Sequence, residues 1–167
     1  MTEAISEYIV NLFSGSVPKE LIVFIISMFP ILELRGGMIA ASLLEVDLLK
    51  GLVICYLGNI LPIPFILLFI RKIFKFLKRF KATRGLIEKL EVRTMRKKES
   101  VLRWRNWGLL LFVAIPLPGT GGWTGALIAA LLDMRIKISF PVIALGVLIA
   151  NIIMSIFSYG FLGVLGL

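Results

Sequence analysis

Apolar and polar residues occur in long alternating blocks along the chain, and this pattern predicts membrane-inserted helices. Four apolar runs, at residues 21–44, 51–70, 108–132 and 138–162, are each long enough to enter a bilayer. Polar turns follow the first and third runs, and a long basic segment separates the second run from the third. We therefore expect a single all-α integral membrane domain that occupies residues 1–167.

The first and third runs are interrupted and are not expected to cross the bilayer as straight helices. Pro30 and the pair Gly36 and Gly37 interrupt the first run, and several prolines and glycines interrupt the third, including Gly121 and Gly122. Irregular backbone at membrane depth is tolerated only where it is packed in protein or lines a cavity. We predict that both runs form re-entrant helical hairpins, each with its break at the glycine pair.

The second and fourth runs are predicted to be spanning helices. Pro62 and Pro64 predict a kink in the second run, because proline lacks the backbone donor that a helix interior needs. Asn59 and Asn151 lie near the middle of the two runs. An asparagine at membrane depth usually forms a hydrogen bond to a neighbouring helix, so we expect both residues at helix contacts or at a polar midplane.

The two halves of the chain, residues 21–70 and 108–167, have the same order of parts and suggest an inverted repeat. Each half has an apolar arm with proline, a Gly-Gly pair, an alanine-rich arm, an acidic residue in the turn and a helix with a central asparagine. The first spanning helix must end in the cytoplasm and the second hairpin must start there, so the hairpins would enter from opposite sides. In this alignment Pro30, Gly36, Gly37, Ala40, Ala41, Glu45 and Asn59 match Pro116, Gly121, Gly122, Ala129, Ala130, Asp133 and Asn151.

Positive charge is concentrated in the connection between the halves, residues 71–107. From Arg71 to Arg105 the chain has fourteen lysines or arginines and only three acids. The net charge of the whole chain is +9. Basic charge between apolar segments predicts a cytoplasmic location. The connection begins with an amphipathic pattern typical of a helix in the membrane interface, and Gly85 is expected to interrupt it. We expect no nucleic-acid partner for this basic segment. Residues 1–20 are predicted to form another interfacial helix.

The composition excludes several classes of site. Apolar residues make up 59% of the chain and charged residues 17%, whereas soluble domains are nearer half and a quarter. Histidine is absent and Cys55 is the one cysteine, so a Cys/His metal cluster, a Ser-His-Asp triad and an intrachain disulfide are all ruled out. No nucleotide-binding glycine motif occurs. We expect no enzyme activity, no cofactor and no bound metal.

Glu33 and Arg35 are the charged residues that lie deepest in an apolar run. A charge at the bilayer centre costs about 2.5–3.5 kcal/mol even on lenient insertion scales, so both residues need partners, a water-filled cavity or a function. One interpretation is a charged centre in which Glu33 carries protons; another is a structural ion pair, and a third places both near the headgroups.

The second hairpin is expected to supply the facing wall of a substrate or ion site. Its break would expose backbone N–H groups that attract anions, together with hydroxyl and indole donors. The predicted substrate- or ion-binding residues are Glu33, Arg35, Gly36 and Gly37 with Pro116, Pro118, Gly119, Thr120, Gly121, Gly122, Trp123 and Thr124.

Two motifs connect the chain with known families. The sequences E-L-R-G-G at residues 33–37 and P-L-P-G-T-G-G-W-T-G at residues 116–125 resemble the motifs of the small multidrug export protein family. The resemblance extends from about residue 21 to 158. The layout is more distantly similar to the DedA/VTT superfamily, whose members have paired re-entrant hairpins and move lipids such as undecaprenyl phosphate. DedA proteins have acids and arginines in both hairpins, whereas the second hairpin here has neither.

These resemblances imply a small secondary transporter, with proton coupling as an option, that moves an amphipathic small molecule or a lipid. One alternative is a translocase for lipids of the undecaprenyl phosphate type, with DedA-like architecture. Another is a membrane scaffold that does not transport and binds a partner or anionic lipid through its basic loop. Two spanning helices and two hairpins are few for a closed pathway, so we expect a homodimer in contact with membrane lipids.

Overall fold

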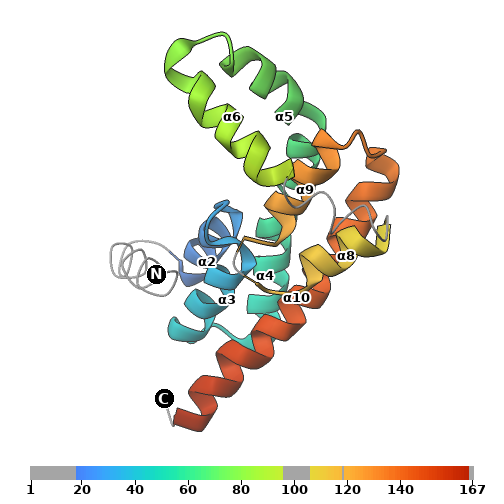
Figure 1. Ribbon diagram of the computed structural model, residues 1–167. Coiled ribbons are helices and arrows are strands. Elements are labelled where there is room, and N and C mark those ends of the chain that lie inside the picture. The colour runs from blue at the N-terminus through green and yellow to red at the C-terminus, as the bar shows by residue number, and fades with distance from the viewer. Residues whose placement is uncertain (1–17, 96–105, 118, 166–167) are drawn as a thin grey trace. The chain divides into compact units, whose positions relative to one another are not determined.

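The computed structural model describes residues 18–95, 106–117 and 119–165, and within these ranges the chain forms helices and no strand (Figure 1). The predicted interfacial helix at residues 1–20 falls almost wholly outside the described residues. The helices are α2 (Lys19–Met28), α3 (Glu33–Leu43), α4 (Leu48–Ile60), α5 (Ile63–Leu77), α6 (Lys81–Met95), α8 (Asn106–Ala114), α9 (Gly122–Leu131) and α10 (Ile136–Leu165).

The helices form two compact units. The first unit contains α2, α3, α4 and the part of α10 from Val147 onward. The second unit contains α5, α6, α8, α9 and the part of α10 up to Gly146. Each unit thus contains one of the two predicted hairpins, and each is described by itself.

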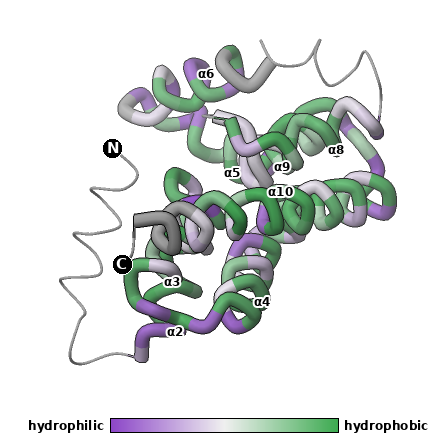
Figure 2. The backbone as a smooth tube through the Cα atoms, turned by 90° about the horizontal axis from the view of Figure 1, so that it is seen from below, coloured by the Kyte–Doolittle hydropathy of each residue, from purple (hydrophilic) through white to green (hydrophobic). Residues whose placement is uncertain are grey.

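Two helices have the length and composition of membrane spans. They cover Leu48–Leu77 and Ile136–Gly160, with mean hydropathies of 2.3 and 2.4. A turn at Leu61 and Pro62 separates the first of them into α4 and α5, where the sequence predicted a kink. Figure 2 shows hydrophobic residues dominating α8, α9 and α10, whereas hydrophilic residues alternate with them along α6. The all-helical fold and these two helices agree with a membrane protein.

In the first unit, α2 and α3 form the first hairpin, and both pack against α4. Apolar side chains of α2 and α3, including Ile26 and Met38, are fully buried. The irregular turn of the hairpin lies between Met28 and Glu33, around Pro30. Gly36 and Gly37 lie inside α3 and are buried, so the predicted break at this pair is wrong.

Close packing explains why α3 contains glycine at residue 37. A Cβ atom there would overlap the hydroxyl oxygen of Ser27 on α2 and would come within 3.0 Å of the sulfur of Cys55 on α4. Glycine therefore allows three helices to approach one another, while Pro30 interrupts the hydrogen bonding between α2 and α3.

In the second unit, α8 and α9 form the second hairpin, and α9 also packs against α5 and α6. The irregular turn begins at Ile115 and ends at Gly121, the N-cap of α9. The φ angle of Gly121 is 123°, a conformation that favours glycine. Gly122 is the first residue of α9, so only the first member of this predicted glycine pair belongs to the break.

The amphipathic connection is interrupted earlier than predicted. Gly85 lies within the continuous helix α6, so the expected interruption at Gly85 is wrong. The break lies between Leu77 and Lys81, where the Thr83 hydroxyl donates to the Leu77 carbonyl over 2.6 Å. A Cβ atom at Gly85 would meet only open space, so this glycine has no close packing to make in the unit.

Candidate functional site

Glu33 begins α3 in an unusual backbone conformation. Its φ angle is 49°, in the left-handed region, and its N–H donates to the Phe29 carbonyl over 2.8 Å. A residue other than glycine in this conformation costs about 1–3 kcal/mol, and such residues cluster at functional sites. The side chain is also buried, with 5% of its surface exposed. Position and conformation are therefore both costly for this acid.

Arg35 lies two residues further along α3 and is half-buried. The Glu33 carboxylate and the Arg35 guanidinium interact electrostatically. On a regular helix residues two apart point in different directions, but Glu33 is at the irregular start of α3. The structure thus brings the two predicted charges into one local group, with the buried glycines 36 and 37 directly after them.

The turn of the second hairpin is held by the Thr120 side chain. Its hydroxyl oxygen lies 2.8 Å from the carbonyl oxygens of Ile115 and Leu117, and it accepts a hydrogen bond from the Leu117 N–H over 3.2 Å. The sequence had suggested this hydroxyl as a ligand donor. In the structure it serves the hydrogen bonding of its own turn.

The other predicted residues of the second hairpin surround this turn. Pro116 is half-buried, Gly119 is exposed and Pro118 lies outside the described residues. Gly121 and Gly122 are buried at the start of α9, and Trp123 and Thr124 follow them as half-buried residues. All of these belong to the second unit, so the expectation that they face Glu33 and Arg35 stays a prediction.

Asn59 and Asn151 each donate to a backbone carbonyl of another helix within the first unit. The Asn59 amide lies 3.5 Å from the Ser27 oxygen on α2, and the Asn151 amide lies 2.8 Å from the Leu52 oxygen on α4. Both side chains are buried. Among the described residues neither amide oxygen has a hydrogen-bond partner. These asparagines therefore join helices and leave two buried acceptors.

Sequence reasoning missed the polar contacts that join the end of α3 and its following turn to other segments. The Tyr159 hydroxyl donates to the Val46 carbonyl over 2.7 Å, and the Ser42 hydroxyl donates to the Ser158 carbonyl over 3.0 Å. The Lys19 ammonium donates to the Leu44 carbonyl over 2.7 Å. An aromatic residue with a polar tip near the end of a spanning helix is the one signal that could have indicated Tyr159.

Outside the apolar helices, the clearest electrostatic effect is on α6. The Arg84 side chain donates to the Glu88 carboxylate over 2.8 Å, one helical turn away. This hydrogen bond lowers the pKa of Glu88 and raises that of Arg84. Both side chains are exposed. In the part of the chain that the structure describes, no group of three or more acids or cysteines could hold a metal ion.

Comparison with known proteins identifies the family. The family model described as "Putative small multi-drug export protein" matches residues 33–153, which is well over half of the chain. The match begins at Glu33 and includes both hairpin motifs. Comparison with curated proteins and with solved structures gave no match, and the likeness to DedA proteins stays a prediction. The chain belongs to the small multi-drug export protein family.

Proposed function

We propose that the chain is a small secondary transporter, built as an inverted repeat of two re-entrant hairpins, that exports an amphipathic organic cation. The observation that carries this proposal is the buried acid Glu33, in a left-handed conformation beside Arg35, inside an apolar hairpin of an export-protein family. Placing an acid in an apolar hairpin costs free energy, and an apolar residue in a purely structural role would avoid that cost.

The first support for the repeat comes from the ends of α3 and α9. Each helix is followed, two residues after its last residue, by an acidic residue in the left-handed conformation: Glu45 with φ 54° after α3 and Asp133 with φ 57° after α9. The next N–H donates over 2.9 Å to an alanine carbonyl five residues earlier, from Val46 in one hairpin and from Met134 in the other. The members of each pair are 88 positions apart in the sequence. The first residues of α4 and α10 are also 88 positions apart.

Close contacts at glycine recur at the same spacing. A Cβ atom at Gly58 would lie 2.8 Å from a carbonyl oxygen of α2 and 3.0 Å from the Cβ of Ser27. A Cβ atom at Gly146 would lie 3.1 Å from a carbonyl oxygen of α8 and 2.8 Å from the Cβ of Val113. Ser27 and Val113 are 86 positions apart, which places a two-residue insertion in the second hairpin turn.

The same spacing relates two side chains that bind the turns after the hairpins. Tyr159 donates to the carbonyl of Val46 in the first unit, and Arg71 pairs with Asp133 in the second. Arg71 and Tyr159 are 88 positions apart. In this register Gly37 corresponds to Gly125 rather than to Gly121 and Gly122.

The register also defines the chemical asymmetry between the halves. The counterpart of Glu33 is Gly121, which also has a positive φ, and the counterpart of Arg35 is Trp123. One half thus offers an acid and the other an indole at related positions. A carboxylate and an aromatic ring are the groups that recognise an organic cation. A single buried carboxylate can neutralise either a proton or such a cation, which makes exchange of the two the simplest form of coupling.

Transport by the purified full chain in proteoliposomes tests this proposal. With an imposed pH gradient, we expect a fluorescent lipophilic cation to move in the direction opposite to the flow of protons. We expect Glu33→Gln to abolish that movement. Glu20→Gln is the matched control, because Glu20 is an exposed acid in the first turn of α2. Wild-type transport by the Glu33→Gln variant would show that the proposed centre is wrong.

Two further measurements separate the alternatives. Movement of a phosphate-bearing lipid that is lost in Arg35→Gln, with no cation transport by the wild type, would identify a lipid translocase. A wild-type chain that moves neither class of substrate would favour the scaffold with a basic loop.

A further inference from the structure

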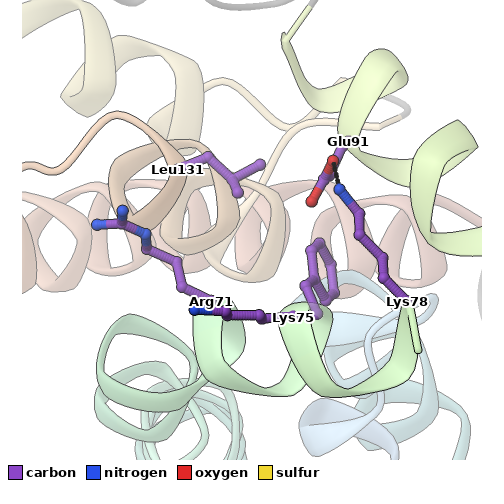
Figure 3. A pocket seen from close by; sticks show the side chains of 6 residues that line it. Arg71, Lys75, Lys78, Glu91 and Leu131 are labelled. Atoms are coloured by element: carbon purple, nitrogen blue, oxygen red, sulfur yellow. Dashed lines mark hydrogen bonds and ion pairs between the residues drawn. The ribbon is translucent and has the colours of Figure 1, made fainter.

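A pocket of about 190 Å³ lies within the second unit, between α5, α6 and α9 (Figure 3). Its walls combine charged and apolar side chains from the consecutive helices α5 and α6 and from α9, which comes later in the chain. The lining residues are Arg71, Phe74, Lys75, Lys78, Glu91 and Leu131.

The charges around this pocket are not balanced. Arg71 and Lys75 lie one turn apart on α5, and Lys78 directly follows the last residue of that helix, so the three side chains line the same side of the pocket. Lys78 donates to the Glu91 carboxylate over 2.6 Å, as the dashed line in Figure 3 shows, and Arg71 pairs with Asp133. Within the described ranges no carboxylate lies at ion-pair distance from Lys75. Three cations face two carboxylates, which leaves one positive charge at Lys75.

The pocket also has an apolar wall. Phe74 is buried and Leu131 is half-buried. Beyond the pocket, Phe76 and Phe80 form an edge-to-face aromatic pair and are both exposed. A helix with exposed aromatic residues beside lysines is typical of the membrane interface. A free inorganic anion would need only the cations, whereas a lipid headgroup uses the cations and the apolar wall together.

We propose that this pocket binds the phosphate of an anionic lipid headgroup, with Lys75 as the main contact and Arg71 and Lys78 beside it. The ammonium of lysine binds phosphate as a point charge, and the guanidinium of arginine matches two phosphate oxygens. The adjoining glycerol and first methylenes lie against Phe74 and Leu131. This site requires only a membrane surface with anionic lipid and does not depend on export.

The experiment uses the full chain, purified in a neutral detergent and mixed with equimolar phosphatidylglycerol and phosphatidylcholine that have identical acyl chains. Native mass spectrometry measures which lipid stays bound. We expect wild type to retain phosphatidylglycerol, and Lys75→Gln to lower that retention about tenfold, as the loss of one charge-assisted contact does. Arg71→Gln gives a second variant with a reduction in the same direction.

Lys72→Gln is the matched control, because Lys72 is an exposed lysine on the same helix that does not line the pocket. It removes the same charge, so the pocket requires that phosphatidylglycerol retention stay close to wild type. Equal losses in Lys72→Gln and Lys75→Gln would mean diffuse attraction to the surface and would overturn the site, as would equal retention of both lipids by wild type.

Soluble competitors identify the source of the phosphate. Displacement of phosphatidylglycerol by glycerol phosphate, at concentrations where glycerol has no effect, supports recognition of the headgroup phosphate. Binding of inorganic phosphate at Lys75 without any preference for phosphatidylglycerol would identify a free anion as the ligand and would overturn the lipid assignment.

Discussion

The two hairpins share features of backbone geometry at their ends but differ in their chemistry. Each ends in a left-handed acidic residue, and the helix after each packs a glycine against the first arm. The first hairpin carries Glu33 and Arg35, whereas the second carries Gly121 and Trp123 at the positions that the proposed repeat relates to them. The features that recur in both hairpins are small residues and helix ends. The charges of the first hairpin are not among these shared features, which is why we take them as the best candidates for function.

The cost of the difference falls on the first hairpin. A left-handed conformation costs an ordinary residue about 1–2 kcal/mol, whereas glycine adopts it freely. Glu33 has this cost and also buries an acidic side chain, whereas Gly121 is buried too but has neither the conformational cost nor a charge. A residue that destabilises its own surroundings is better explained by a function than by a structural role.

The largest expected effect comes from blocking the glycine contacts that the two halves share. Gly58→Leu and Gly146→Leu should each lower the free energy of unfolding by about 3 kcal/mol, because the new side chain meets a backbone carbonyl that cannot move aside. Thermal unfolding in detergent measures both. Gly85→Leu is the control, since its surroundings are open. If either variant behaved like the Gly85 variant, the two hairpins would not pack alike.

An intermediate effect of opposite sign is expected at Glu33. Glu33→Gly should raise the free energy of unfolding by about 1–2 kcal/mol, because it relieves the left-handed conformation and gives the first hairpin the residue that the second one has. The same variant should lose cation export. Glu45→Gly, at an exposed acid with φ 54°, should also gain stability but keep export. A loss of stability in Glu33→Gly would show that the acid is a structural residue.

The smallest effect is expected from the Arg84–Glu88 pair, far from either hairpin in sequence. The pKa of Glu88 is lower in the folded chain, so its contribution to stability is present above the unfolded-state pKa, about 4.3, and is lost as pH falls through the folded-state pKa. The difference in melting temperature between wild type and Glu88→Gln should be small near neutral pH and absent in acid. A difference that grew as pH fell would contradict this sign. Because both side chains are exposed, the change in stability from this pair should be the smallest of the three. The changes in the hairpin variants can be compared with it.

Much of the helical content could be predicted because long apolar runs and polar turns have clear signatures. The broken runs and the division of the helix at Pro62 also followed from proline. The exact break in the first hairpin did not, because a glycine in sequence is compatible with either an irregular backbone or a close helix contact. At Gly37 the contact with Ser27 decides between the two, and only the folded structure contains it.

The candidate site was predictable only where it violates a rule. Glu33 and Arg35 were recognisable because charges are costly in an apolar run. The left-handed conformation of Glu33 has no sequence signature, and the bond from Tyr159 to Val46 joins residues 113 apart, beyond the reach of any periodicity. The lipid pocket was equally hidden, because Lys75 looks like every other lysine in a basic segment.

The division of α10 between the two units has a consequence for the synthesis of the protein. The bonds from Asn151 to Leu52 and from Tyr159 to Val46 complete the first unit with residues 99 and 113 positions later in the chain. At about 5–20 residues per second, a ribosome needs roughly 5–20 s to make that stretch. The second unit, although encoded later, has all its helices once Gly146 has emerged. The first unit, which contains Glu33, is therefore synthesised first but completed last. Until the end of α10 has been made, the carbonyls of Leu52 and Val46 lack the donors that Asn151 and Tyr159 provide.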